Sequence, residues 1–160
     1  MGTNIRWARK GLAVAVIAAT CWGVSSAQAA PPTTAEVAHA FITALFVNRD
    51  MSANDRFLSK DFIQHSPMIK DGPAGDKEFL EARRKRDPKH YLAVDKWRDV
   101  IDHVLVDGDS FAVYHHVYTN PHDRGRVFLD IWRVKNGKLI EHWDVIQPVP
   151  VTSANSNTMW

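Results

Sequence analysis

Arg126–Gln147 reads RVFLDIWRVKNGKLIEHWDVIQ, and this stretch decides the fold. Val, Ile, Leu, Phe and Trp dominate both halves, and an Asn-Gly pair separates them, so the pattern predicts a β-hairpin. Strands this apolar belong to a core. Yet Asp130, His142 and Asp144 lie inside them, where an unpaired charge costs free energy. The conflict between pattern and chemistry marks a candidate site.

The register of the hairpin decides whether these side chains meet. A two-residue Asn-Gly turn pairs Val134 with Leu139 and turns His142 away from Asp130. A three-residue loop, Lys135–Gly137, pairs Val134 with Lys138 instead. It places Asp130 opposite His142, Trp132 opposite Ile140 and Phe128 opposite Asp144. We predict the three-residue loop, because it gathers the polar groups on one apolar wall.

The first 29 residues are typical of a secretory signal peptide. Arg6, Arg9 and Lys10 precede an apolar run, Gly11–Val24, and Ala27-Gln28-Ala29 forms a small-x-small cleavage site. The alternative, an uncleaved anchor helix, is disfavoured because the run is short for a membrane span. We expect a periplasmic or secreted protein, cleaved after Ala29, with no membrane partner once cleaved.

Removal of residues 1–29 changes the charge balance. The segment carries three basic and no acidic side chains, so the formal net charge falls from +2 to −1. The mature chain therefore has no general attraction for nucleic acid. The single cysteine, Cys21, leaves with the segment, so a core without disulfides must hold the domain together.

The remaining chain predicts helices followed by antiparallel strands. A linker at 30–33 precedes a single domain over 34–150, which opens with a helix over 34–48 capped by Thr34. The further predictions are a short helix at 51–58, an extended piece at 60–67, a helix at 75–86, strands at 93–106 and 110–119, and a flexible tail at 151–160. This order predicts an α+β fold with helices on one face of a sheet.

Two motifs resemble a known family. FIQHSP at 62–67 and DIWRVKNGKLIEHWDVIQPVP at 130–150 resemble the SnoaL-like polyketide cyclases of the nuclear-transport-factor-2-like superfamily. The resemblance covers about residues 34–150. It implies a cone, in which a curved antiparallel sheet and the N-terminal helices enclose a pocket, and many members dimerise through the sheet.

The resemblance also implies the roles of particular residues. Asp130 takes the position of the aspartate that acts as acid and base in an aldol condensation, without metal or cofactor. His116 matches the family's strand histidine, although Tyr114-His115-His116 stands where many relatives have His-x-His. Gln64 and His65 match a polar pair at the pocket edge. Because neighbouring strand residues point to opposite faces, only one of His115 and His116 can face the pocket.

This chemistry suits the residue types. Proton removal beside a carbonyl needs a base near the proton and a donor near the oxygen that gains charge. Burial of Asp130 among Phe128, Trp132 and Ile140 would raise its pKa, and His116 or His142 would donate. We expect Phe41, Met68, Trp97 and Trp132 to form an apolar wall for a small ring-bearing ligand, with Tyr114 and Asp144 also at the ligand.

Other interpretations stay open. Asp130 and His142 could form a buried ion pair that fixes the hairpin, and Asp144 could pair with Arg126. The three histidines and two aspartates could bind zinc or iron, although the resemblance implies a metal-free site. The chain could be a periplasmic binding protein without turnover, or a structural dimer with a vestigial pocket.

Overall fold

The computed structural model describes residues 30–86, 98–118 and 122–160. The expected signal peptide, the start of the 93–106 strand and Trp97 lie outside these residues. The helices are α1 (Thr34–Ile42), its π-helical continuation η1 (Thr43–Val47), α2 (Ala53–Phe57) and α3 (Gly72–Arg86). The strands are β1 (Leu58–Gln64), β2 (Arg98–Asp107), β3 (Ser110–Tyr118), β4 (Arg126–Lys135) and β5 (Lys138–Pro148).

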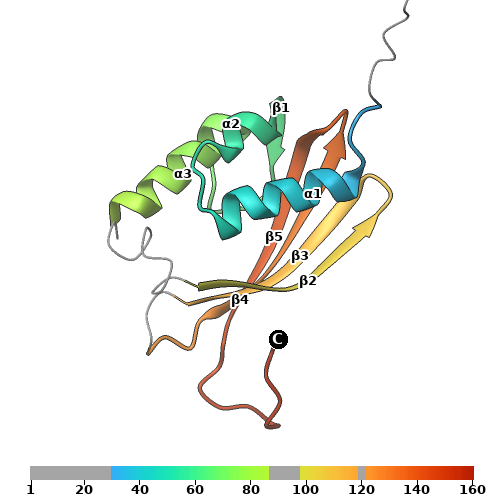
Figure 1. Ribbon diagram of the computed structural model, residues 1–160. Coiled ribbons are helices and arrows are strands. Elements are labelled where there is room, and N and C mark those ends of the chain that lie inside the picture. Colours follow the sequence, from blue (N-terminus) through green and yellow to red (C-terminus); the bar gives the residue numbers. More distant parts are fainter. Residues whose placement is uncertain (1–29, 87–97, 119–121) are drawn as a thin grey trace, which may run out of the picture.

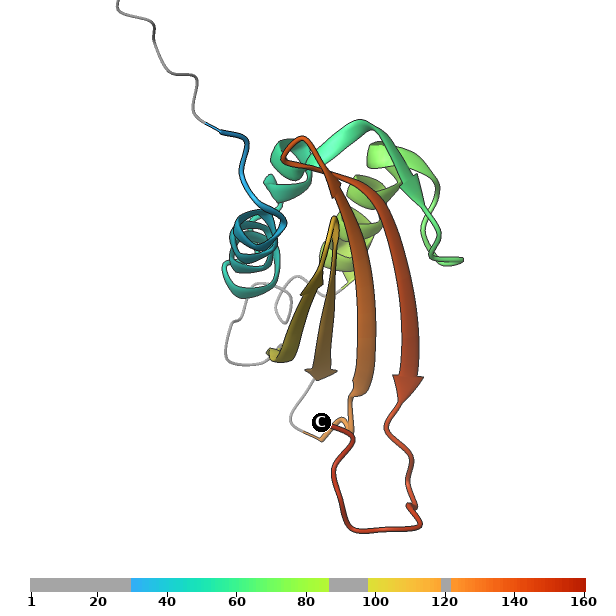
Figure 2. The same cartoon turned by 90° about the vertical axis from the view of Figure 1, so that its right-hand side faces the viewer.

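The five strands form one curved, unclosed sheet in the order β1-β5-β4-β3-β2. β2 to β5 are antiparallel neighbours, whereas β1 pairs with β5 in parallel. All three α-helices lie on one face of the sheet, which we call the inner face (Figure 1). Figure 2 shows the strands bending beside the helices. The α+β cone with helices on one side is therefore confirmed.

The core forms between α1 and the inner face. Thr33, not Thr34, caps α1 in a capping box with Glu36, so the helix begins one residue earlier than the predicted cap allows. Val37 and Phe41 then fall on the buried side. Phe41 is completely buried and meets the Trp132 ring edge-on, with ring centroids 4.8 Å apart. This contact fixes the helix over the middle of the hairpin.

The predicted three-residue loop of the hairpin is wrong. Lys135 pairs with Lys138, so the turn has two residues, and Asn136 and Gly137 both have positive φ, 51° and 74°. This is the geometry that an Asn-Gly hairpin favours. A β-bulge follows, between the Val134–Leu139 and Arg133–Glu141 pairs. It leaves Ile140 as the extra residue of β5.

The two-residue turn and the bulge together change every pair that the sequence predicted. Asp130 lies opposite Asp144, not His142, and Trp132 lies opposite His142, not Ile140; Phe128 pairs with Ile146. Asp130, His142 and Asp144 nevertheless point to the same face of the sheet, as predicted. One extra residue in β5 compensates for the one removed from the loop, so the three polar side chains still share the inner face.

The C-terminal residues contact the outer face of the sheet, which is the face away from the helices (Figure 1). The Trp160 ring stacks on His116, with centroids 4.3 Å apart, and the Tyr114 hydroxyl donates to the Met159 carbonyl. The flexible tail expected at 151–160 stays a prediction. Among the described helices, none combines the length and apolar composition of a membrane span.

Candidate active site

A cavity of about 100 Å³ lies between the inner face of the sheet and the helices. Its apolar walls come from the helical side (Leu45, Phe46, Met68, Ile69, Phe79, Leu80) and from the sheet (Val117, Phe128, Trp132, Ile146). Its polar lining consists of Arg49, Asn54, Asp76, Arg83, Asp99, His115, Asp130, His142 and Asp144. An apolar chamber with a few converging polar groups is the usual form of a small-molecule site.

Asp130 lines this cavity and lies between two histidines. The residue is only 5% exposed. Its Oδ2 is 2.8 Å from Nε2 of His115 on β3, and its Oδ1 is 3.4 Å from Nε2 of His142 on β5. Strand alternation brings these groups together, because His115 shares the inner face with Val113 and Val117.

His115 is held by carboxylates on both sides. Its Nδ1 is 2.8 Å from Oδ1 of Asp99 on β2, while its Nε2 faces Asp130. Each ring nitrogen must carry a proton to donate to its carboxylate, so the ring is an imidazolium cation. Burial lowers the pKa of His115, but the hydrogen bonds to Asp130 and Asp99 outweigh it and raise that pKa from 6.5 to about 9.

The same ion pair sets the charge of Asp130. Burial alone would raise the pKa of Asp130, but the hydrogen bond from His115 and the contact with the His142 imidazole lower it below its ordinary value of 3.8. The expected increase of this pKa is therefore wrong. The two imidazoles stabilise the carboxylate more than the apolar walls of Phe128 and Trp132 penalise it.

His142 is oriented by Gln64 of β1. The Gln64 Oε1 accepts from the Ser66 backbone N–H at 2.8 Å and lies 3.0 Å from His142 Nδ1. Its amide nitrogen donates to Asp76 Oδ1 of α3 at 3.0 Å. Because Oε1 is the acceptor, His142 Nδ1 carries a proton and Nε2 points toward Asp130. The Trp132 ring stacks on His142, with centroids 3.8 Å apart, and fixes the ring plane.

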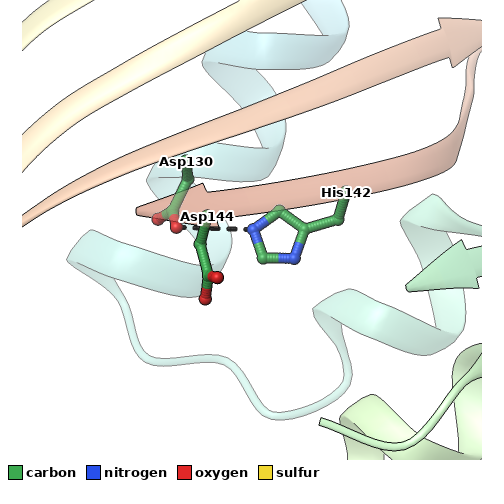
Figure 3. Close-up of side chains that lie close together, drawn as sticks. All are labelled: Asp130, His142 and Asp144. Atoms are coloured by element: carbon green, nitrogen blue, oxygen red, sulfur yellow. Dashed lines mark hydrogen bonds and ion pairs between the residues drawn. The ribbon is translucent and has the colours of Figure 1, made fainter. Parts of the chain in front are cut away.

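Asp144 completes a cluster with Asp130 and His142 (Figure 3). Its Oδ2 accepts from the Ser66 hydroxyl at 2.8 Å. Among the described residues, these three side chains each offer one ligand atom, and the three atoms lie within 4.8 Å of one another. They are therefore the residues that could hold a metal ion, with Gln64, Ser66 and His115 orienting them from outside.

His116, which we expected to serve Asp130, lies on the outer face. Its Nδ1 is 2.7 Å from Asp102 Oδ2, and Trp160 covers the ring. The reason is strand alternation: once His115 points inward, His116 must point outward. Tyr114 lies on the outer face for the same reason, where it contacts Met159.

Apart from Tyr114 on the outer face and Trp97 outside the described residues, the expected ligand-binding residues divide into three groups. Met68, Phe128, Trp132 and Asp144 line the cavity. Gln64 lies behind His142 and Phe41 is packed in the core, so neither lines it. His65 follows Gln64 on the strand and points the other way, where it stacks on Trp143 with centroids 4.6 Å apart.

Sequence reasoning missed two carboxylates of the site. Asp99 and Asp76 come from β2 and α3, far along the chain from the hairpin. No local pattern marks either residue. The inward orientation of His115, by contrast, can be predicted from the sequence. Phe111, Val113 and Val117 alternate with more polar residues and identify the inner face, and His115 falls on the same side of the strand.

Comparisons with known proteins agree with this architecture. The model of the SnoaL-like domain family matches residues 38–142. No curated protein matches this sequence. A candidate polyketide cyclase from Bacillus cereus ATCC 10987 is 20% identical, with a TM-score of 0.52, over 71% of each chain.

Two further solved structures show the same fold. AclR, a candidate hydroxylase from Streptomyces galilaeus, is 20% identical over 74% of this chain and 83% of its own, with a TM-score of 0.57. A candidate isomerase of the SnoaL-like family from Agrobacterium tumefaciens str. C58 is 14% identical over 69% and 94%, with a TM-score of 0.54. The family model covers well over half of the chain, so this protein belongs to the SnoaL-like domain family.

Proposed function

We propose that this protein is a cofactor-independent acid/base enzyme of the aldol-condensation or isomerisation type. Its substrate is a small hydrophobic carbonyl compound, and Asp130 is the central catalytic group. One observation carries the proposal: a buried, ionised carboxylate lies within hydrogen-bond distance of two imidazoles in the lining of a largely apolar cavity. A candidate polyketide cyclase and a candidate isomerase among its structural neighbours support the same class of small-molecule chemistry.

The two oxygens of Asp130 have different tasks in this proposal. Oδ2 is held by His115, whose positive charge keeps the carboxylate ionised. Among the described residues, the hydrogen-bonding contact of Oδ1 is the longer one, 3.4 Å from His142 Nε2. Oδ1 therefore accepts the proton from the carbon beside the carbonyl. The C–H bond breaks, and its electron pair moves onto the carbonyl oxygen to give an enolate.

His142 shares the proton with Asp130. A carboxylate with a lowered pKa is a weak base, so it needs a partner that takes up the proton. His142 Nε2 lies beside Oδ1, and the resulting imidazolium would be stabilised by Asp130 on one side and Gln64 on the other. The proton then returns to carbon in an isomerisation, or to the new alkoxide in an aldol condensation.

Deuterium exchange tests this proposal. Wild type and Asp130→Asn are incubated in D₂O with a panel of cyclic aryl ketones such as indanone, and deuterium at the α-carbon is followed by mass spectrometry. Loss of a general base predicts about a 10²–10⁴-fold slower exchange in the variant. Asp102→Asn is the matched control, because Asp102 also pairs with a histidine but on the outer face. Equal rates for wild type and Asp130→Asn would remove Asp130 from the role.

A non-catalytic periplasmic binding protein is the second candidate. The observation that favours it is that His115 forms buried ion pairs with both Asp99 and Asp130, since buried ion pairs also serve purely structural roles. Saturable binding of the ketones without exchange, at every pH between 5 and 9, would select this candidate over the enzyme.

The proposal includes export to the periplasm and a homodimer. The basic start, apolar run and small-x-small site of residues 1–29 support export. Cell fractionation followed by N-terminal sequencing tests it, with Ala30 expected as the first residue of the mature chain. Sedimentation equilibrium measures the oligomeric state, and a monomer at all concentrations would refute the dimer.

A further inference from the structure

Asp76 is a buried carboxyl group that α3, on the helical side, contributes to the lining of the cavity. It belongs to the second turn of α3 and is only 5% exposed. Gly75, next to it, lets the helix approach the preceding loop closely: a Cβ there would lie 1.9 Å from the Lys70 carbonyl oxygen. This tight join between loop and helix fixes where Asp76 meets the cavity.

The two carboxyl oxygens of Asp76 differ in their hydrogen bonds. Oδ1 accepts from the Gln64 side-chain amide at 3.0 Å. Within the parts of the chain that the structure describes, Oδ2 has no hydrogen-bond partner, although the side chain lines the cavity beside Phe79 and Leu80. Among the described residues, Oδ2 is not one of the fully enclosed polar atoms that lack a partner, so it is open to the cavity that Asp76 lines and can form a hydrogen bond with a ligand.

The surroundings of Asp76 favour the neutral acid. Burial is the largest influence and raises the pKa of Asp76 above 3.8. The nearby His142 and the hydrogen bond from Gln64 lower this pKa, whereas the negative charges of Asp130 and Asp144 raise it, and the net change is an increase. The other charged groups around the cavity are Arg83 on the same helix, Arg49 after η1, and the Asp99–His115 pair. Asp130 and Asp76 thus sit in one cavity with pKa values displaced in opposite directions. Such a pair is the usual arrangement for a base and an acid that act together.

We propose that Asp76 is the acid of this site and donates its Oδ2–H to the carbonyl oxygen of the ligand. This inference rests on the proposed function, and it adds a catalytic residue from α3 to Asp130 of β4. While Asp130 Oδ1 takes the proton from carbon, the Oδ2–H bond of Asp76 breaks and its proton moves to the oxygen that gains charge. The product is a neutral enol, and the reverse transfer restores both carboxyl groups. The ligand class is therefore an uncharged, enolisable ketone whose oxygen points toward α3.

A binding experiment tests the hydrogen bond without requiring turnover. Indanone and indane differ only in the carbonyl group, and their dissociation constants are measured by calorimetry or by tryptophan fluorescence. We expect wild type to prefer indanone by about tenfold. Asp76→Asn should keep this preference, because its oxygen can accept from Gln64 while its NH₂ donates to the ketone. Asp76→Ala should lose it. Glu78→Gln, an exposed position on the same helix, is the control and should match wild type.

Exchange kinetics then separate donation of a hydrogen bond from transfer of a proton. Asp76→Asn should slow α-deuteration of indanone about 10²-fold with its affinity unchanged, because an amide donates but does not release a proton. Wild type should lose activity as the pH rises through the pKa of Asp76, and Asp76→Asn should lack that alkaline limb. If wild type shows the ketone preference but no exchange, the proposed function fails and the Asp76 hydrogen bond stands. If wild type lacks the preference and Asp76→Asn gains it, Asp76 is ionised and this inference is wrong.

Discussion

The His115 imidazolium should make the stability of the whole domain depend on pH in the neutral-to-alkaline range. Its pKa is about 9 in the folded chain and 6.5 in the absence of its partners. Between these two values the folded state holds a proton that the unfolded state has released. The full stabilisation is therefore present below pH 6.5 and is lost as the pH rises through 9. At about 1.4 kcal/mol per pH unit, the loss amounts to about 3 kcal/mol.

His115→Gln removes the titrating group while keeping one side-chain donor. Because Asp99 and Asp130 would then lie near each other without the cation, the variant should be less stable at pH 6 by about 3–5 kcal/mol. Its stability should change little between pH 6.5 and 9. Wild type should fall by about 1.4 kcal/mol per pH unit at its steepest.

Urea unfolding at half-unit pH intervals measures both curves. His65→Gln is the matched control, because His65 is 40% exposed at its side chain and lies on the outer face beside Trp143. Its curve should run parallel to that of wild type. If His115→Gln also runs parallel to wild type, His115 is not the proton-binding group and the argument for an ionised Asp130 loses its basis.

Three further changes test the packing around the cavity. Gly75→Ala should lower the free energy of unfolding, measured with urea, by about 1–3 kcal/mol, because the new Cβ would collide with the Lys70 backbone. A variant as stable as wild type would show that the loop can move aside. Leu139→Ala, at a fully buried position of the hairpin, should cost about 2–5 kcal/mol, and a loss below 1 kcal/mol would contradict its place in the core. Asp76→Asn should gain stability over wild type as the pH rises from 4 to 7, since the folded state resists ionisation of that carboxyl group; a constant difference across this range would mean that its pKa is normal.

The hairpin shows how far sequence reasoning reaches. The alternation of β4 and the need to keep Asp130, His142 and Asp144 together identified the inner face. A three-residue loop and a two-residue loop with a bulge in β5 both keep these groups on one face. The sequence analysis predicts the first, whereas the structure has the second, with Ile140 as the bulged residue. Only the strong preference of Asn-Gly for a two-residue turn distinguishes the two.

The partners of Asp130 were harder to predict for a different reason. The resemblance directed attention to His116, while the alternation around Phe111 and Val113 favoured His115. The contributions of Asp99 and Asp76 depend on how β2 and α3 are placed against the hairpin, and this placement follows from the packing of the entire core. Distant carboxylates of this kind carry no signature in a single sequence.

The bulge at Ile140 has a consequence for the comparison of related sequences. A relative with a regular hairpin would need its histidine and aspartate one position nearer to the glycine of the turn, because otherwise both would face outward. Counting from the turn would then align unlike residues, and a functional match would be scored as a mismatch. Homologues are better aligned outward from the Asp130–Asp144 pair, with the gap left at the bulge.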